Sequence, residues 1–167
     1  MEMNADSVKE IALSQVVSVA IQGTVCAIDL IWVERVLPLL ALQSLPGGHD
    51  SVAGLMDYHG DSCVVVDLAT YLGRPGTKPY TLDTPIILCT DGLTRVGFIV
   101  DEVLQIDAVE STLMQMQRQF KESASFFLGE IRVSTGLVLL LDMQRLLTFN
   151  FIAKQPSGDD HHLERLV

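Results

Sequence analysis

The chain has 167 residues, 49% of them hydrophobic, and a formal net charge of −10, so one domain, or two compact halves around one core, fits its length. Its 11 lysines and arginines are scattered, which argues against nucleic-acid binding because phosphate contacts need clustered cations. Its apolar residues come in runs of strand length, far short of the ~20 that span a bilayer, which predicts a soluble protein without direct membrane insertion.

Residues 1–14 form a lead ahead of the first strand pattern. Met1 to Ser7 lack the basic region and apolar core of a signal peptide, so we expect a cytoplasmic protein. The cysteines agree with this location, since their number is odd and each stands alone within an apolar strand pattern. They are expected to be buried thiols rather than disulfides: Cys26, Cys63 and Cys89.

The first strand pattern predicts a hairpin. Two apolar runs, 16–21 and 24–28, flank a turn at Gln22 and Gly23. Residues 30–36 fit either a helical turn or an irregular strand. We favour the turn, and Pro38 limits any helix at this place.

A second hairpin is predicted over residues 52–67, with its tip at Asp57 to Asp61. Residues 68–72 then resemble a helical turn closed by Gly73. Residues 74–79 have the composition of a linker. They mark the best internal boundary of the chain.

The second half begins with a hairpin over residues 85–100 that turns at Asp91 and Gly92. A strand is expected around 104–109, and another hairpin over 129–141. Residues 143–151 have the apolar spacing of a closing helix. The polar tail covers residues 154–167.

The two halves repeat one pattern with a period of roughly 70 to 75 residues. Each has a hairpin, then a glycine-bounded apolar strand that runs into an aspartate and a helix-like segment. Asp67 and Asp142 occupy equivalent places, so we interpret them as helix caps rather than paired catalytic carboxylates. The repeat predicts two small β units, the first about 16–75 and the second about 84–150.

Motifs of known catalytic chemistry are missing from the chain. It has no dinucleotide or phosphate-binding glycine motif, no nucleophile elbow and no His-Glu-x-x-His. His49 and His59 lack the local spacing of a zinc site, so we interpret them as ordinary histidines. No cofactor is expected. A small enzyme or ligand-binding β-barrel remains an alternative, although the chain offers few polar residues for a pocket.

Three ordered segments carry a family pattern. In residues 52–68, a glycine and two apolar residues precede Asp-Tyr-His-Gly and an apolar strand that ends in Asp-Leu. A second segment, residues 26–36, runs from the end of the first hairpin through Val33 and Val36, and a third, residues 96–103, has the form Val-Gly-x-x-Val-Asp-x-Val. Together they resemble the CheW family, the coupling proteins of bacterial chemosensory systems, over about residues 15–150.

The resemblance implies a mainly β fold of two SH3-like five-stranded β-barrels packed around a shared core, with a few short helices. It places a single domain at 15–153 and allows the N-terminal strand to be shared between the barrels. It also implies a non-catalytic adaptor that couples the cytoplasmic tip of a methyl-accepting chemoreceptor to the regulatory domain of a CheA-like histidine kinase. Such an adaptor is recruited to membrane-attached receptor arrays, where other CheW-like proteins or a second copy are further partners.

Two sets of contact residues follow from the resemblance. The receptor-binding set is Arg35, Val36, Leu55, Asp57, His59 and Gly60, and the kinase-binding set is Val96, Gly97, Val100 and Asp101. Three positions depart from the family pattern. Arg35 stands where the family has glutamate, Asp57 where it has asparagine, and His59 where it has arginine.

These changes of charge suggest a receptor tip of altered charge. Our hypothesis is an adaptor of a specialised pathway, such as one that controls pili, biofilm formation or an alternative chemotaxis system. The alternative is an array spacer or regulator that binds the kinase or itself and has lost receptor coupling. Both hypotheses depend on the family position of Arg35 and His59.

Overall fold

The computed structural model describes residues 15–76, 79–109 and 126–153, so the predicted lead and tail lie outside the described residues. Ten strands and three short helical segments make up this part of the chain. In chain order they are β1 (Gln15–Ile21), β2 (Thr24–Asp29), the 3-10 turn η1 (Leu30–Trp32), β3 (Val33–Pro38), β4 (Val52–Tyr58), β5 (Asp61–Asp67), α1 (Leu68–Tyr71), β6 (Pro85–Thr90), β7 (Arg95–Ile99), β8 (Glu102–Ala108), β9 (Phe127–Val133), β10 (Gly136–Leu141) and α3 (Met143–Thr148). None of the described helices has the length and hydropathy needed to span a bilayer.

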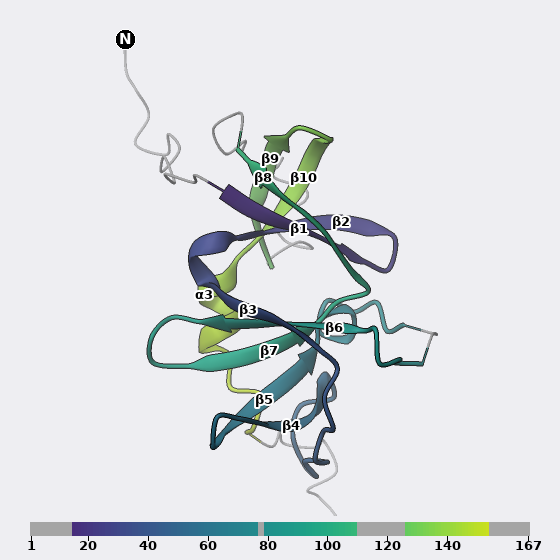
Figure 1. The fold of residues 1–167 in the computed structure, drawn as a ribbon, viewed down its shortest axis with the longest axis vertical. Coiled ribbons are helices and arrows are strands. Elements are labelled where there is room, and N and C mark those ends of the chain that lie inside the picture. The colour runs from purple at the N-terminus through teal and green to yellow at the C-terminus, as the bar shows by residue number, and fades with distance from the viewer. Residues whose placement is uncertain (1–14, 77–78, 110–125, 154–167) are drawn as a thin grey trace, which may run out of the picture.

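The strands form two five-stranded sheets, which lie one above the other in Figure 1. Sheet 1 has the order β8-β1-β2-β10-β9, and sheet 2 has the order β3-β6-β7-β5-β4. The predicted hairpins β1–β2, β4–β5, β6–β7 and β9–β10 are all antiparallel pairs. The mainly β fold with two five-stranded units is therefore confirmed.

The two halves do repeat, but they do not form separate sheets. Sheet 1 takes its first hairpin, β1–β2, from the first half and β8, β9 and β10 from the second. Sheet 2 takes β6–β7 from the second half and β3, β4 and β5 from the first. The prediction of one barrel over 16–75 and another over 84–150 is therefore wrong about strand membership. The reason is that β3 leaves sheet 1 to pair with β6, and β8 leaves sheet 2 to pair with β1.

Among the described strands, no ladder joins the two outer strands of either sheet. In sheet 2, Gln43 follows β3 and forms a two-way backbone bridge with Leu55 of β4, with N–O distances of 2.8 Å. Gly54 makes this approach possible, because a Cβ there would lie 2.7 Å from the Gln43 carbonyl oxygen. Sheet 2 thus curls toward a barrel without closing through strand pairing.

The core has three layers, which explains why the strands are apolar on both faces. Within β6, Ile87 and Cys89 point into a central core between the sheets, whereas Ile86 and Leu88 point into the concave side of sheet 2. A smaller cluster that includes Val16, Ala27, Ile131 and Leu140 fills the concave side of sheet 1. A strand buried on both faces loses the apolar-polar alternation of a surface strand.

Aspartates begin both helices at equivalent places in the repeat. The Asp67 carboxylate accepts a hydrogen bond from the Thr70 amide at 3.2 Å, and Asp142 accepts one from the Arg145 amide at the same distance. The prediction of helix caps is confirmed, since this side-chain acceptor satisfies a free amide of the first turn.

Two predicted elements have different bounds in the structure. Residues 30–36 combine both interpretations, a 3-10 turn followed by the start of β3. The closing helix ends at Thr148 rather than at 151, because Phe149 is extended and Asn150 accepts hydrogen bonds from the amides of residues 152 and 153.

Candidate functional site

The edge strand β3 carries the first predicted contact residues and contains a β-bulge at Glu34. Val33 pairs with Cys89 and Arg35 with Leu88, so Glu34 is the extra residue. Val36 pairs with Ile87, which belongs to the central core. Paired residues share a face of the sheet, so Val36 points toward the space between the sheets, where it is 45% exposed.

Arg35 and Val36 therefore lie on opposite faces of sheet 2. Leu88, the partner of Arg35, belongs to the concave side of sheet 2. Arg35 is exposed at the edge of that side. The structure thus separates the charged and the apolar members of the predicted receptor-binding set.

Glu34 is bound by Arg95 from the start of β7. Arg95 donates from Nε to Oε2 at 2.6 Å and from Nη2 to Oε1 at 3.1 Å, a bidentate pair. The Arg95 guanidinium also lies 5.2 Å from the centre of the Tyr58 ring and 4.0 Å from the Asp61 carboxylate. Hydrogen bonding to Glu34 raises the pKa of Arg95.

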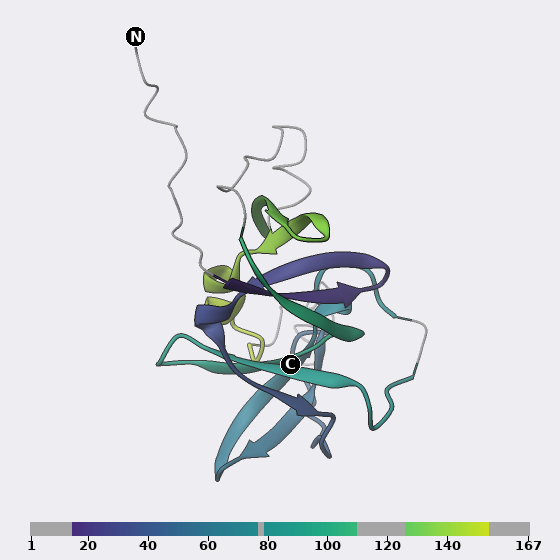
Figure 2. The same cartoon turned by 45° about the horizontal axis from the view of Figure 1, so that its top comes forward.

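The strand β8 repeats the geometry of β3 in sheet 1. Val103 pairs with Val19 and Gln105 with Ser18, so Leu104 is the extra residue of a second bulge. Ile106 pairs with Val17 of the central core and is 57% exposed. It is the counterpart of Val36. The edge strands β3 and β8 are both drawn on the viewer's side of the molecule in Figures 1 and 2.

The tip between β4 and β5 holds three more residues of the predicted receptor-binding set. Asp57 accepts a hydrogen bond from the Gly60 amide at 2.8 Å. His59 and Gly60 both have positive φ, 52° and 89°, which is the geometry of a type I′ hairpin turn. The His59 ring lies edge-on to Tyr58, with 4.4 Å between centroids.

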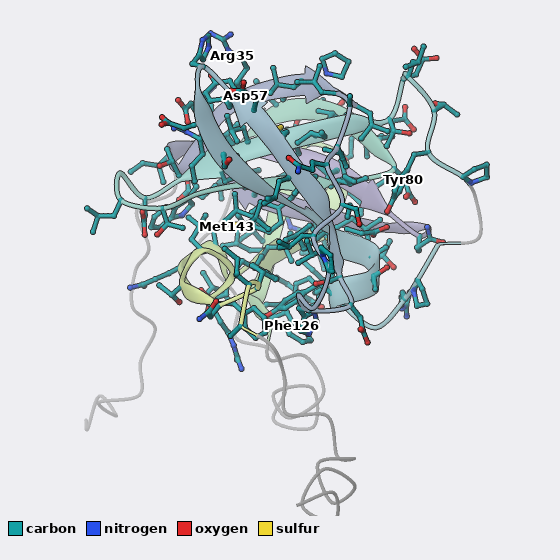
Figure 3. All side chains as sticks on the ribbon, turned by 90° about the horizontal axis from the view of Figure 1, so that it is seen from below. Arg35, Asp57, Tyr80, Phe126 and Met143 are labelled. Carbon is teal, nitrogen blue, oxygen red and sulfur yellow. The ribbon has the colours of Figure 1, made fainter. Side chains whose placement is uncertain are left out.

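Arg35 and Asp57 project at the same end of the molecule in Figure 3, away from Phe126. Both side chains are exposed. Leu55 is half-buried, and its backbone is engaged in the bridge to Gln43. The accessible members of the set are therefore Arg35, Val36 and the tip residues.

The predicted kinase-binding residues are mostly inside the protein. Val96 and Val100 belong to the central core, and Gly97 is buried with Ile86, Val65 and Met56 around it. These three positions are buried in the described structure. Their pattern has a packing cause, since a Cβ at Gly97 would lie 2.9 Å from Ile86 Cγ2.

Asp101 is the exposed member of that set. Its carboxylate accepts a 2.7 Å hydrogen bond from the Gln22 amide, and its own amide donates to the carbonyl of Ala20. Asp101 therefore ties the β7–β8 junction to the β1–β2 turn.

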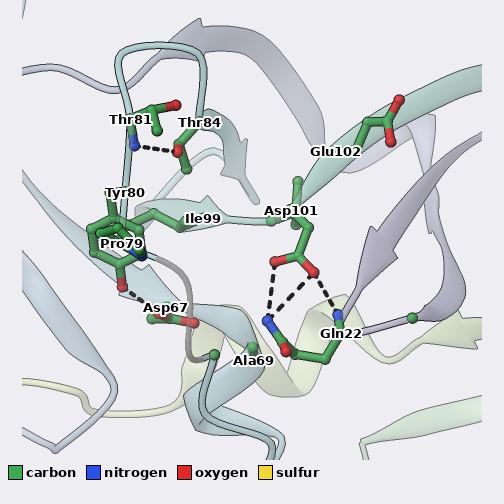
Figure 4. Close-up of a pocket in the computed structure, with 13 residues that line it drawn as sticks. Gln22, Asp67, Ala69, Pro79, Tyr80, Thr81, Thr84, Ile99, Asp101 and Glu102 are labelled. Atoms are coloured by element: carbon green, nitrogen blue, oxygen red, sulfur yellow. Dashed lines mark hydrogen bonds between the residues drawn. The ribbon is translucent and has the colours of Figure 1, made fainter.

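A cavity of about 570 Å³ lies beside Asp101 (Figure 4). Gln22 and Asp101 stand on one side of it, and Tyr80 donates a hydrogen bond to Asp67 on the other. Burial, and then the bond to Asp67, raise the pKa of Tyr80. Two of the carboxylates that line the cavity have structural roles, since Asp101 holds the β1–β2 turn and Asp67 caps α1.

His49 and His59 have different surroundings in the described structure. His49 accepts a hydrogen bond at Nδ1 from the Ser51 amide and packs against Phe149 and Phe151. His59 lies at the β4–β5 tip. Across the described residues, no group of three His, Cys, Asp or Glu side chains has the placement of metal ligands.

Two parts of this surface were not predicted from the sequence. The Glu34–Arg95 pair joins residues 61 positions apart, and no local pattern marks it. Ile106 could have been found from the repeat, because an alignment of the two halves matches it to Val36.

Comparisons with known proteins give one family. A family model described as a CheW-like domain matches residues 15–150. A crystal structure of the scaffolding protein TtCheW from Thermoanaerobacter tengcongensis is similar, with a TM-score of 0.73 and 17% sequence identity, over 86% of this chain and 97% of that chain. No curated protein matches the chain. At this identity the structural similarity shows the fold.

Proposed function

The chain belongs to the CheW-like domain family, and we propose that it is a non-catalytic adaptor that couples a methyl-accepting chemoreceptor to a CheA-like histidine kinase. In this proposal it works in the cytoplasm, at membrane-attached receptor arrays. The pathway is a specialised one, for example one that controls pili or biofilm formation. The receptor contact uses the surface between the two edge strands, and the kinase contact uses an end of one sheet.

The exposed pair Val36 and Ile106 carries the receptor part of the proposal. Both side chains extend from bulged edge strands on the faces that cover the central core. Apolar residues on such a face suit the apolar stripe of a helix, which inserts side chains at i, i+3 and i+4 into a groove. Because Val36 and Ile106 belong to different sheets, the binding of a helix to both would depend on how the two sheets are arranged.

Arg35 supports the specialised pathway. It is exposed, whereas the carboxylate of Glu34 beside it is held by Arg95. The edge of β3 therefore offers a positive charge where the family has a negative one. A receptor tip with a glutamate or aspartate at the matching place would be preferred, since charge matching sets specificity more than affinity.

The kinase part of the proposal concerns the surface around Asp101. Asp101 is exposed, whereas Val96, Gly97 and Val100 are buried. We propose that the surface around Asp101, at the junction of β7 and β8, contacts the kinase. Modest contacts of this kind gain strength in an array through multivalency.

Calorimetric binding tests the proposal. The purified protein is titrated with receptor cytoplasmic fragments, and separately with the kinase regulatory domain. Val36→Gln and Ile106→Gln should each weaken receptor binding by about tenfold, which corresponds to about 1.4 kcal/mol. Leu137→Gln is the matched control, because Leu137 is 48% exposed on β10, outside the two edge strands.

The outcomes separate the hypotheses. Binding of both partners, with receptor binding lost in the two variants and kept in the control, supports the adaptor. Kinase binding without receptor binding would favour the array spacer or regulator. Binding of neither partner would reject the proposal.

A further inference from the structure

We propose that Arg95 is a positioning residue that decides the charge of the β3 surface by holding Glu34, so that Arg35 is the charge offered to a partner. The inference rests on the proposed function, because it concerns the specificity of the same surface. Arg95 itself would not touch the partner; it would act through Glu34.

The Glu34–Arg95 pair, called the clamp below, is needed because of the bulge in β3. Val33 and Val36 both face the central core, and two charged residues, Glu34 and Arg35, lie between them. A bulge places two consecutive residues opposite one residue of the neighbouring strand. A free Glu34 carboxylate would therefore stand beside the Arg35 guanidinium and cancel much of its charge.

Arg95 is itself fixed in place. Its guanidinium lies over the Tyr58 ring and next to Asp61, while its Nε and Nη2 both donate to Glu34. The planar fork matches a carboxylate in two places, which a lysine ammonium does not. The Glu34 side chain is thus turned toward β7, away from the free edge of β3.

The second bulge provides an internal comparison. The equivalent of Glu34 on β8 is Leu104, and the equivalent of Arg35 is Gln105, whose amide donates to Asp107. Neither residue is charged. The clamp therefore belongs to the one bulge at which two opposite charges are adjacent.

The first experiment needs no partner. Paramagnetic relaxation of backbone amides by an anionic, carboxylate-bearing nitroxide reports the local charge. In Arg95→Gln the freed Glu34 should reduce the relaxation at residues 35 and 36 by about twofold, as expected for one charge at several ångströms in salt solution. The double variant Glu34→Gln/Arg95→Gln should restore it, and the amides of 105 and 106 serve as the matched control.

The second experiment measures binding of receptor cytoplasmic fragments to the same variants. Arg95→Gln should weaken binding by about fivefold, as for loss of one rim charge, and the double variant should recover to nearly the wild-type affinity. Arg95→Lys should resemble Arg95→Gln in part, because it keeps the charge and loses the fork.

The two arms distinguish the possible failures. If the double variant remains as altered as the single one in both arms, Arg95 acts by holding the strand and the inference is overturned. If the nitroxide arm shows no change in Arg95→Gln, it is overturned as well. If the nitroxide arm behaves as expected while receptor fragments fail to bind the wild type, the clamp stands and the proposed function fails.

Discussion

Ser134, next to β9, donates a 2.8 Å hydrogen bond to Asp107 of β8 and so joins the two edges of sheet 1. Gln105 donates to both oxygens of the same carboxylate, and Ser18 of β1 lies 3.4 Å from one of them. Asp107 is only 8% exposed. A buried carboxylate with this many donors is stabilised in its charged form.

The first prediction concerns pH. Hydrogen bonds from Gln105, and then from Ser134, lower the pKa of Asp107 below its ordinary 3.8. The stabilisation is therefore complete above that value and is lost as pH falls through the lower folded-state pKa. Urea denaturation should show Asp107→Asn less stable than wild type at pH 7, with the difference shrinking at pH 3.

Ser134→Ala is the control for this prediction, because it removes one donor and leaves the carboxylate. It should show a smaller loss of the same sign. A difference between wild type and Asp107→Asn that stays constant from pH 7 to pH 3 would contradict the role of the charge.

The second prediction is that Gly97 acts through packing. Gly97→Ala should lower the free energy of unfolding by about 1 to 3 kcal/mol, as expected for overpacking a filled core, because the new Cβ would meet Ile86 Cγ2 at 2.9 Å. The penalty should be smaller in an Ile86→Leu background, which lacks the β-branched methyl. Equal penalties in both backgrounds would argue against the clash.

The third prediction separates the two helix caps. Asp142→Ala should cost about 1 kcal/mol of stability, the usual value for a cap. Asp67→Ala should cost more, because Asp67 also accepts a hydrogen bond from Tyr80. Thermal denaturation of Tyr80→Phe, alone and combined with Asp67→Ala, measures the extra part; additive losses in the double variant would show that the two residues are not coupled.

The fourth prediction concerns the thiols. Burial raises the pKa of Cys26 to about 11 and that of Cys89 to about 12, and Cys63 is also buried with a raised pKa. An aromatic disulfide reagent at pH 8 should leave all three unreactive in the native protein and label all three in denaturant. Rapid native labelling of any of the three would contradict the burial of that thiol.

The raised pKa values of the thiols also predict a loss of stability at alkaline pH. An unfolded thiol loses its proton near pH 8.5 to 9, whereas the folded thiols keep theirs to higher pH. The unfolded state therefore binds fewer protons above this range, and stability should fall as pH rises from about 9. Replacing Cys89 with Ala should flatten this fall.

Local structure could be predicted from the sequence because its causes lie within a few residues. The turn at Gln22 and Gly23, the tip at His59 and Gly60, and the caps at Asp67 and Asp142 each depend on near neighbours. The glycines and aspartates that mark them have conformational or capping roles independent of the rest of the fold. The repeat, and from it the two similar β units, followed from these marks.

The partition of strands could not be predicted in this way. β3 pairs with β6 and β8 pairs with β1, so each half of the chain gives one strand to the other sheet, and the central core lies between the two sheets that result. Strand pairing therefore depends on burial across the whole molecule. The predicted units had the right number of strands, but some strands were assigned to the wrong sheet. The same choice buries Val96, Gly97 and Val100 while exposing Val36 and Ile106.

By itself, then, the sequence determined the hairpins, the caps, the repeat and the buried cysteines, since each has a short-range signal or an apolar pattern. Only the tertiary structure decided which strands exchange between the sheets, which face each contact residue occupies, and that Arg95 holds Glu34 across 61 positions. The physical reason is that strand pairing and ion pairs join residues through space. Their free energy depends on partners that no local window of sequence contains.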